Sequence, residues 1–377
     1  MTNSSKLRNS FGKLKQAGLL AGLNKILFIL KKREQYGSWI ATSYSSSGLN
    51  NSARFVVDML AECGFESKLV TVSDNNDIDR EVKLFNPAIV VLEALWVVPE
   101  KFDILTKKYP EVKWNVRLHS EVPFLSNEGV AFDWILKYLK YPNVTISTNS
   151  LKSLADLRRL VSRNENIHGD VEKLIKYTPN YYPEKFETSF KKVQNTEVHI
   201  GCFGAIRPFK NHVVQAMAAI EYAASNKKYL KFYVNGTRTE QAGINCLKNL
   251  RSLFYHATNC ELIELPWLSH NEFKELLHDK IDLALQCSFT ETFNIVTADA
   301  VSSNVPVVVS NEIDWVSSMV QANFSDISDI VKKMNRATKY AFVLNKQNQK
   351  QLKKYLKKSK FAWIDFIQTS KKTGLLH

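Results

Sequence analysis

The residues best equipped for chemistry are two acids, Glu291 and Asp299, in the segment 288–300. This segment follows an apolar run that ends near Gln286 and opens a predicted helix. In an open α/β sheet, ligands gather beyond the carboxyl ends of the strands. The free N–H groups of a helix start at that place suit a diphosphate. Glu291 then lies within reach of a neutral polar ligand such as a sugar, and Asp299 can accept two hydrogen bonds from ribose hydroxyls.

Basic and small residues near two other predicted strand ends could act on the same ligand. Arg207 and Lys210 lie in the loop 204–212, where they would point at a diphosphate and stabilise a departing nucleotide by charge. Gly48, in a small loop ahead of a helix, can let the backbone approach a phosphate; an ordinary helix-capping turn is the alternative. His119 ends a strand, and a ligand contact and a structural role are both open for it.

The fold must bring these residues together. In each half of the chain, apolar runs alternate with helical patterns, which predicts two doubly wound α/β domains. Strands are expected in the first half at 39–43, 68–72, 88–92, 114–119, 145–148 and 173–177. Helices are expected between them at 52–63, 99–109, 129–139 and 151–161. In the second half we expect strands at 198–203, 230–234, 261–265, 281–286 and 305–310. The helices of that half are expected at 213–224, 240–255, 271–277, 294–302, 327–340 and 345–369.

The same alternation predicts the domain boundaries. Residues 1–36 form a basic segment, helical over 5–35, which could lie on a membrane, lie on DNA or pack on the protein. The first domain spans 37–180, a linker follows over 181–195, and the second domain spans 196–343. Residues 344–377 form a C-terminal helix.

Composition narrows the class of protein. The net charge of +14 favours an anionic partner such as nucleic acid, an anionic membrane or phosphates, although a solvated basic surface would also account for it. The five cysteines are irregularly spaced, which argues against a zinc site or a disulfide framework and favours a reducing cytoplasm. The chain has no long apolar run and no secretory signal pattern, so we expect no membrane-spanning helix.

The segment 288–300 resembles the nucleotide-sugar motif of the large retaining family of GT-B glycosyltransferases. That motif has two acids separated by seven residues, with Phe-Gly or Phe-Asn between them, and this chain has Phe293 and Asn294 there. Asp299 stands where the family usually has Glu, so its reach is one methylene shorter. Lys210 matches the family's basic loop, but Arg207 lies three residues before it, where the family's Arg lies five before.

The resemblance implies a GT-B fold, with two Rossmann-like domains facing across a cleft and the last helix crossing back to the first domain. It implies sugar transfer with retention, in which the donor's phosphate accepts the acceptor's proton. The residues implied in catalysis are Lys210, Arg207, Glu291 and His119. Those implied in donor binding are Gly48, Gly204, Thr292, Phe293, Asn294, Ile295 and Asp299. No Asp-x-Asp metal motif stands in a suitable place, so we expect transfer without a metal ion or other cofactor.

For the acceptor, the chain is similar to phage-encoded DNA-modifying glycosyltransferases, in which segments like 204–208 and 117–120 recur. This similarity and the positive charge favour hydroxymethylcytosine in phage DNA, within the host cytoplasm, as the acceptor, with a UDP-sugar as donor. One alternative is synthesis of a bacterial surface polysaccharide or glycolipid, with residues 5–35 on the membrane. Another is a nucleotide-binding module without catalysis, against which the presence of both Glu291 and Asp299 argues.

Overall fold

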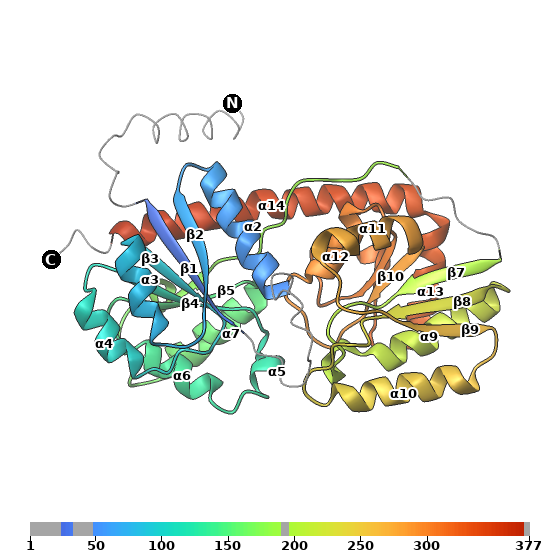
Figure 1. Cartoon of the computed structure of the whole chain (residues 1–377), viewed down its shortest axis with the longest axis horizontal. Coiled ribbons are helices and arrows are strands. Elements are labelled where there is room, and N and C mark those ends of the chain that lie inside the picture. Colours follow the sequence, from blue (N-terminus) through green and yellow to red (C-terminus); the bar gives the residue numbers. More distant parts are fainter. Residues whose placement is uncertain (1–23, 33–47, 190–195, 373–377) are drawn as a thin grey trace.

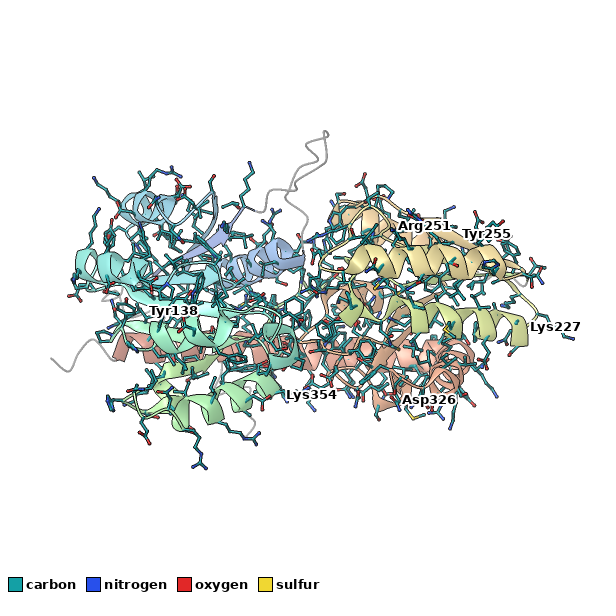
Figure 2. All side chains as sticks on the ribbon, turned by 90° about the horizontal axis from the view of Figure 1, so that it is seen from below. Tyr138, Lys227, Arg251, Tyr255, Asp326 and Lys354 are labelled. Carbon is teal, nitrogen blue, oxygen red and sulfur yellow. The ribbon has the colours of Figure 1, made fainter. Side chains whose placement is uncertain are left out.

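The computed structural model describes residues 24–32, 48–189 and 196–372, which form two α/β domains side by side (Figure 1). Each domain contains a parallel sheet of six strands with helices packed on its faces, so the prediction of two doubly wound domains is confirmed. Figure 2 gives a second view, with Tyr138 in the first domain and Arg251 and Tyr255 in the second.

The first sheet has the strand order β2-β1-β3-β4-β5-β6. Its strands are β1 (Lys25–Lys31), β2 (Glu66–Val72), β3 (Ile89–Glu93), β4 (Lys113–Leu118), β5 (Val144–Thr148) and β6 (Ile175–Tyr177). Its helices are α2 (Gly48–Glu62), α3 (Asp77–Phe85), α4 (Lys101–Lys108), α5 (Val122–Leu125), α6 (Ala131–Tyr138), α7 (Leu151–Ser162) and α8 (Val171–Leu174). The parallel order brings the carboxyl ends of β1, β3 and β4 to one edge of the sheet.

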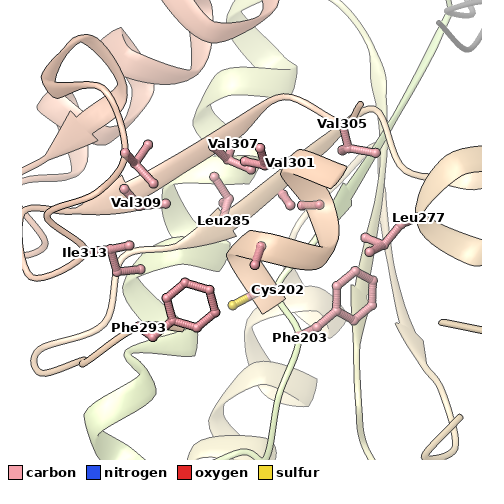
Figure 3. Close-up of a cluster of buried hydrophobic side chains, with 14 of the residues drawn as sticks. Cys202, Phe203, Leu277, Leu285, Phe293, Val301, Val305, Val307, Val309 and Ile313 are labelled. Atoms are coloured by element: carbon pink, nitrogen blue, oxygen red, sulfur yellow. The ribbon is translucent and has the colours of Figure 1, made fainter. Parts of the chain in front are cut away.

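The second sheet has the order β12-β11-β10-β7-β8-β9. Its strands are β7 (Glu197–Gly201), β8 (Tyr229–Val234), β9 (Cys260–Glu264), β10 (Leu283–Gln286), β11 (Val307–Ser310) and β12 (Gln321–Ala322). Its helical elements are η3 (Pro208–Lys210), α9 (His212–Ser225), α10 (Gly243–His256), α11 (His270–Lys280), α12 (Ile295–Ser302), η4 (Ser318–Val320), α13 (Ile327–Lys339) and α14 (Ala341–Lys372). Figure 3 shows apolar side chains from β10, β11 and α12 packed into one core, which fixes the start of α12 against the sheet.

The helix predicted over 5–35 is wrong where the structure describes that segment, because Lys25–Lys31 is the strand β1. Its five central residues, Ile26 to Leu30, are all apolar and almost completely buried. An uninterrupted apolar run fits a helical spacing and a strand equally well, and β1 lies between β2 and β3, covered on both faces. The strand predicted at 39–43 lies outside the described residues.

The structure also differs locally from what the sequence predicts. The strand expected at 173–177 is shorter, because Val171–Leu174 forms the helical turn α8 and β6 begins only at Ile175. Helix α3 was not predicted. Gly48 is part of helix α2 (Gly48–Glu62), so this glycine lies in the helix rather than in a loop ahead of it.

Helix α14 ties the two domains together. It runs along both of them in Figure 1, after a start in the second domain. Near its far end, the Trp363 indole N–H donates to the carbonyl of Pro179 at 2.8 Å. The Trp363 ring also contacts Phe28 of β1, with centroids 5.6 Å apart. The last long helix therefore completes the core of the first domain.

Candidate active site

A cleft of about 1260 Å³ lies between the two domains, at the carboxyl ends of both sheets. Both domains contribute side chains to its walls. Of the eleven site residues predicted from the sequence, ten line it: Gly48, His119, Gly204, Arg207, Lys210, Glu291, Thr292, Asn294, Ile295 and Asp299. Residues that are far apart in the chain are therefore brought together.

Phe293 is the predicted site residue that does not line the cleft. It is 1% exposed, and its ring stacks between Trp315 and Tyr355, with centroids 5.6 and 4.9 Å away. Its carbonyl accepts a hydrogen bond of 2.8 Å from the Trp315 indole. These contacts make Phe293 an apolar anchor that holds the turn leading into α12.

Asn294 shapes the start of α12. Its backbone has φ of 55°, and its side-chain oxygen accepts from the N–H of Thr297 at 2.8 Å, which caps the helix. Its side-chain NH₂ donates to Gln286 at the end of β10, at 2.9 Å. The N–H groups of Ile295 and Val296 belong to the first turn, which has no partners in the helix ladder, and both residues line the cleft. The sequence thus builds a helix N-terminus that suits an anion.

Lys210 and Glu291, which both line the cleft, form an ion pair. Both side chains are nearly buried, at 13% and 9% exposed. The basic loop is held by Asn211, whose side chain donates to the carbonyls of Cys287 at 3.0 Å and Phe324 at 2.8 Å. Gly204 adopts φ of 113°, which a glycine tolerates, and its N–H donates to Asn235 at 2.9 Å. The site thus holds a cation and an anion that a ligand could separate.

Arg207 reaches the cleft from the same loop. Its guanidinium lies 4.7 Å from the ring centre of Phe124 in the first domain, and it pairs with Glu240 at 3.4 Å. Arg238 also pairs with Glu240, at 2.7 Å, and stacks over Trp267 at 4.2 Å. The unusual spacing between Arg207 and Lys210 therefore still puts both cations on the cleft wall.

His119 is held by a buried charge network behind it. Its Nε2 pairs with Glu93, which also accepts from Arg117 at 3.1 Å. Burial would raise the pKa of Glu93, but Arg117 and His119 outweigh it and hold that pKa below its ordinary value. Burial, together with Arg117, lowers the pKa of His119 despite the attraction of Glu93, so the ring is neutral at neutral pH. Because Nε2–H donates to Glu93, Nδ1 is the acceptor atom of the ring.

Arg117 is itself fully buried. Beyond Glu93, it donates to the carbonyls of Thr178 at 3.0 Å and Pro179 at 3.1 Å, and to the side chain of Asn180 at 2.7 Å. The ring of Trp363 lies 5.1 Å from its guanidinium carbon. The connecting segment 178–180 therefore fixes Arg117, Arg117 fixes Glu93, and Glu93 holds the His119 ring.

Thr292 joins the two domains across the cleft. Its hydroxyl accepts from the Asn149 side chain at 3.1 Å and donates to the carbonyl of His119 at 3.4 Å. Asp299 is 3% exposed and is hydrogen-bonded to Tyr182 and His270. The short segment 291–299 thus contacts both the first domain and the connecting segment.

The supporting partners Glu93, Asn149, Tyr182 and His270 were missed by sequence reasoning. Glu93 had one local signal, because it follows directly on the apolar run 88–92 and so ends a buried strand with a charge. His270 precedes the helix predicted at 271–277, but that pattern says nothing of Asp299. These pairings join residues 24 or more positions apart, which no local pattern reveals.

The described part of the chain holds no group of three or more His, Cys, Asp or Glu side chains placed to bind a metal ion. Within residues 24–32, 48–189 and 196–372, no helix combines the length and the apolar character needed to span a bilayer. All five cysteines are free thiols.

No protein-family model matches this sequence, and no curated protein sequence matches it. Solved structures do match. The N-terminal domain of Candida albicans trehalose-6-phosphate phosphatase is 10% identical, with a TM-score of 0.67, over 92% of this chain and 97% of that one. The alpha,alpha-trehalose 6-phosphate synthase from Burkholderia multivorans is 11% identical, with a TM-score of 0.66, over 93% and 100%.

A third match is the sucrose-phosphate synthase from Thermosynechococcus elongatus. It is 12% identical, with a TM-score of 0.64, over 93% of this chain and 98% of that one. Identities this low establish the fold alone. The chain has the GT-B fold predicted for it, with two parallel six-stranded sheets facing across a cleft.

Proposed function

We propose that this protein is a glycosyltransferase that takes a sugar from a nucleotide-diphosphate donor held by its second domain. One observation carries the proposal: Lys210, Glu291 and the start of α12 meet in one interdomain cleft, with Arg207, Asp299 and His119 on its walls. Similarity to sugar-phosphate synthases supports it, and two of the similar structures are described as UDP-forming, which favours UDP as the leaving group.

Each group has a role that follows from its chemistry. Lys210, Arg207 and the first N–H groups of α12 would neutralise charge on the departing diphosphate, since fixed cations and dipoles act strongly in a cleft shielded from water. Donor binding would separate Lys210 from Glu291, which frees the carboxylate to accept from a sugar hydroxyl. Nδ1 of the neutral His119 would accept another.

The reaction would break the bond between the anomeric carbon and the phosphate oxygen and form one to the acceptor oxygen. The acceptor attacks from the face that the diphosphate leaves, which retains the anomeric configuration, and its proton passes to a phosphate oxygen of the leaving group. The chain's residues hold the two substrates and stabilise charge. We propose that no metal ion takes part, because Lys210 and Arg207 supply positive charge at the diphosphate.

For the acceptor we propose hydroxymethylcytosine in DNA, within a cytoplasm. The net charge of +14 supports a polyanion, and Lys31, Lys32 and Arg54 line the first-domain side of the cleft. The alternative, a polysaccharide or glycolipid acceptor at a membrane, depended on a predicted helix over residues 5–35 that would lie on the lipid surface. Since residues 25–31 are a buried strand, that part of the segment is not available to lie on a lipid surface.

Transfer to defined acceptors tests the proposal. Purified protein is offered radiolabelled UDP-sugars with hydroxymethylcytosine-containing DNA, with unmodified DNA and with lipid acceptors. We expect label only on the modified DNA, undiminished by EDTA. Label on a lipid would overturn the acceptor proposal, loss of activity with EDTA would overturn the metal-free one, and absence of label on every acceptor would count against transfer.

Two substitutions test the site within that assay. Lys210→Ala and Glu291→Ala should each abolish transfer while circular dichroism stays unchanged. Lys350→Ala, on the exposed face of α14, is the matched control and should transfer normally. Full activity in both cleft variants would refute the assignment.

A further inference from the structure

The carboxylate predicted to bind ribose is already engaged by two neighbours. Oδ1 of Asp299 accepts from the Tyr182 hydroxyl at 2.8 Å and is 2.6 Å from Nε2 of His270. Oδ2 has no hydrogen-bond partner among the described residues. Asp299 therefore has one oxygen committed to the protein and one available to a ligand.

His270 lies beside Asp299 on the cleft wall. It is the first residue of α11, after the Ser269 cap, and its side chain is 22% exposed. Because Nε2 faces the carboxylate, Nδ1 is the ring nitrogen that is left to hydrogen-bond a ligand. Nδ1 has no partner in the part of the chain that the structure describes.

The imidazole is held in place by aromatic rings. Phe55 of α2, in the first domain, lies 5.4 Å from it between centroids, and Tyr182 lies 6.3 Å away. Phe55 also packs edge-on against Tyr182 at 5.4 Å. With Asp299 fixing Nε2, the orientation of Nδ1 is set before any ligand arrives, which reduces the entropy cost of binding.

We propose that His270 and Asp299 together recognise the ribose of the donor, with Nδ1 hydrogen-bonded to one hydroxyl and Oδ2 accepting from its neighbour. This inference rests on the proposed function, since it requires a nucleotide in the cleft. It also fits the shorter side chain of Asp299, which stands where the family that this segment resembles usually has a glutamate. The shorter carboxylate reaches one hydroxyl, and the histidine bound to it extends the hydrogen-bonding surface to the other.

Binding of ribose and deoxyribose nucleotides tests the proposal without requiring transfer. Dissociation constants are measured by calorimetry for UDP, ADP and GDP, each beside its 2′-deoxy and its 3′-deoxy form. We expect the wild-type protein to favour the ribose form about tenfold, because a missing hydroxyl leaves a partly buried polar atom unpaired. His270→Ala should bring the preference close to one at one of the two positions, the hydroxyl that the histidine contacts, and leave the preference at the other.

A conservative variant and a matched control complete the experiment. His270→Gln should restore much of the preference, since its amide can donate to Asp299 and accept from ribose. His278→Ala, which changes a histidine of the same helix outside the cleft, should keep the wild-type ratio.

The outcomes separate this inference from the proposed function. A wild-type protein that binds none of the nucleotides overturns both. A wild-type protein that binds ribose and deoxyribose forms equally overturns the inference alone. A His270→Ala protein with both forms weakened by one factor also overturns it, because a merely structural histidine would lower both affinities together and leave their ratio unchanged.

Discussion

Replacing the buried Arg117 with methionine should destabilise the first domain strongly, through the charge that it leaves behind. Arg117 and Glu93 are both 0% exposed and lie 3.1 Å apart. Removing one member of such a pair leaves the other charge buried without its partner, which costs about 3–5 kcal/mol. The variant also loses donors to Thr178, Pro179 and Asn180. A loss of about 3–5 kcal/mol is a large part of the free energy of unfolding of a typical domain, which is about 5–15 kcal/mol.

The effect should depend on pH in a defined direction. In the wild type the pKa of Glu93 is held low, so this group contributes stability above its ordinary pKa that is lost as pH falls through the lowered value. In the Arg117→Met protein, burial dominates and the pKa of Glu93 should rise. Its ionisation then costs stability at neutral pH, and the cost shrinks as the pH is lowered.

Urea unfolding at pH 7 and pH 5, followed by tryptophan fluorescence, measures both effects, since the Trp363 ring lies over the Arg117 guanidinium. We expect the difference from wild type to be about 3–5 kcal/mol at pH 7 and smaller at pH 5. A Glu93→Gln/Arg117→Met double variant should recover part of the loss. A difference below about 1 kcal/mol, or one that does not change with pH, would refute the reasoning.

Three further changes test other parts of the site. Gly243→Ala places a Cβ 1.9 Å from the carbonyl oxygen of Ile206, so the basic loop must shift; we expect a loss of about 1–3 kcal/mol in urea unfolding and weaker nucleotide binding, and wild-type values would contradict this. His212 is fully buried and its pKa is lowered to about 3, so the unfolded chain takes up its proton below about pH 6.5 while the folded one does not. Stability should fall by about 1.4 kcal/mol per pH unit from 6.5 downward on account of this group, and His212→Leu should remove that slope in pH-dependent unfolding; an unchanged slope would exclude it. Asn149→Ala removes the hydrogen bond to Thr292 across the cleft and should cost about 1 kcal/mol in urea unfolding, without lowering nucleotide affinity; weaker nucleotide binding would show that it acts on the donor.

The sequence was most informative where chemistry is local. Glu291 and Asn294 lie in the turn between β10 and α12, and Asp299 lies in that helix, so their spacing implied a shared cleft, and the structure places all three there. The alternation of apolar runs and helices likewise predicted two parallel sheets, although β1 and β12 were not among the predicted strands. The order of strands and helices along the chain was enough to predict the cleft, because the carboxyl ends of parallel strands lie at one edge of a sheet.

Prediction failed where burial from elsewhere decides the structure. Residues 26–30 are apolar throughout, and only their place between β2 and β3 makes them a strand. The hydrogen-bond partners of His119 and Asp299, Glu93 and His270, lie far from them in the sequence, so no local spacing predicts these contacts. Phe293 is part of the motif, yet tertiary packing turns it inward against Trp315. In each case the missing information was a long-range contact.

The contacts of Trp363 have a consequence for the order in which the protein matures. Its ring covers Arg117 and Phe28, which belong to the first sheet, but α14 is translated after both sheets. A nascent first domain therefore emerges from the ribosome with this part of its interior open to water. The charge network behind His119 is covered by Trp363 only once α14 has docked on the first domain. The two halves are thus poor candidates for exchange by gene fusion, because a first domain transplanted without α14 would lack part of its own core.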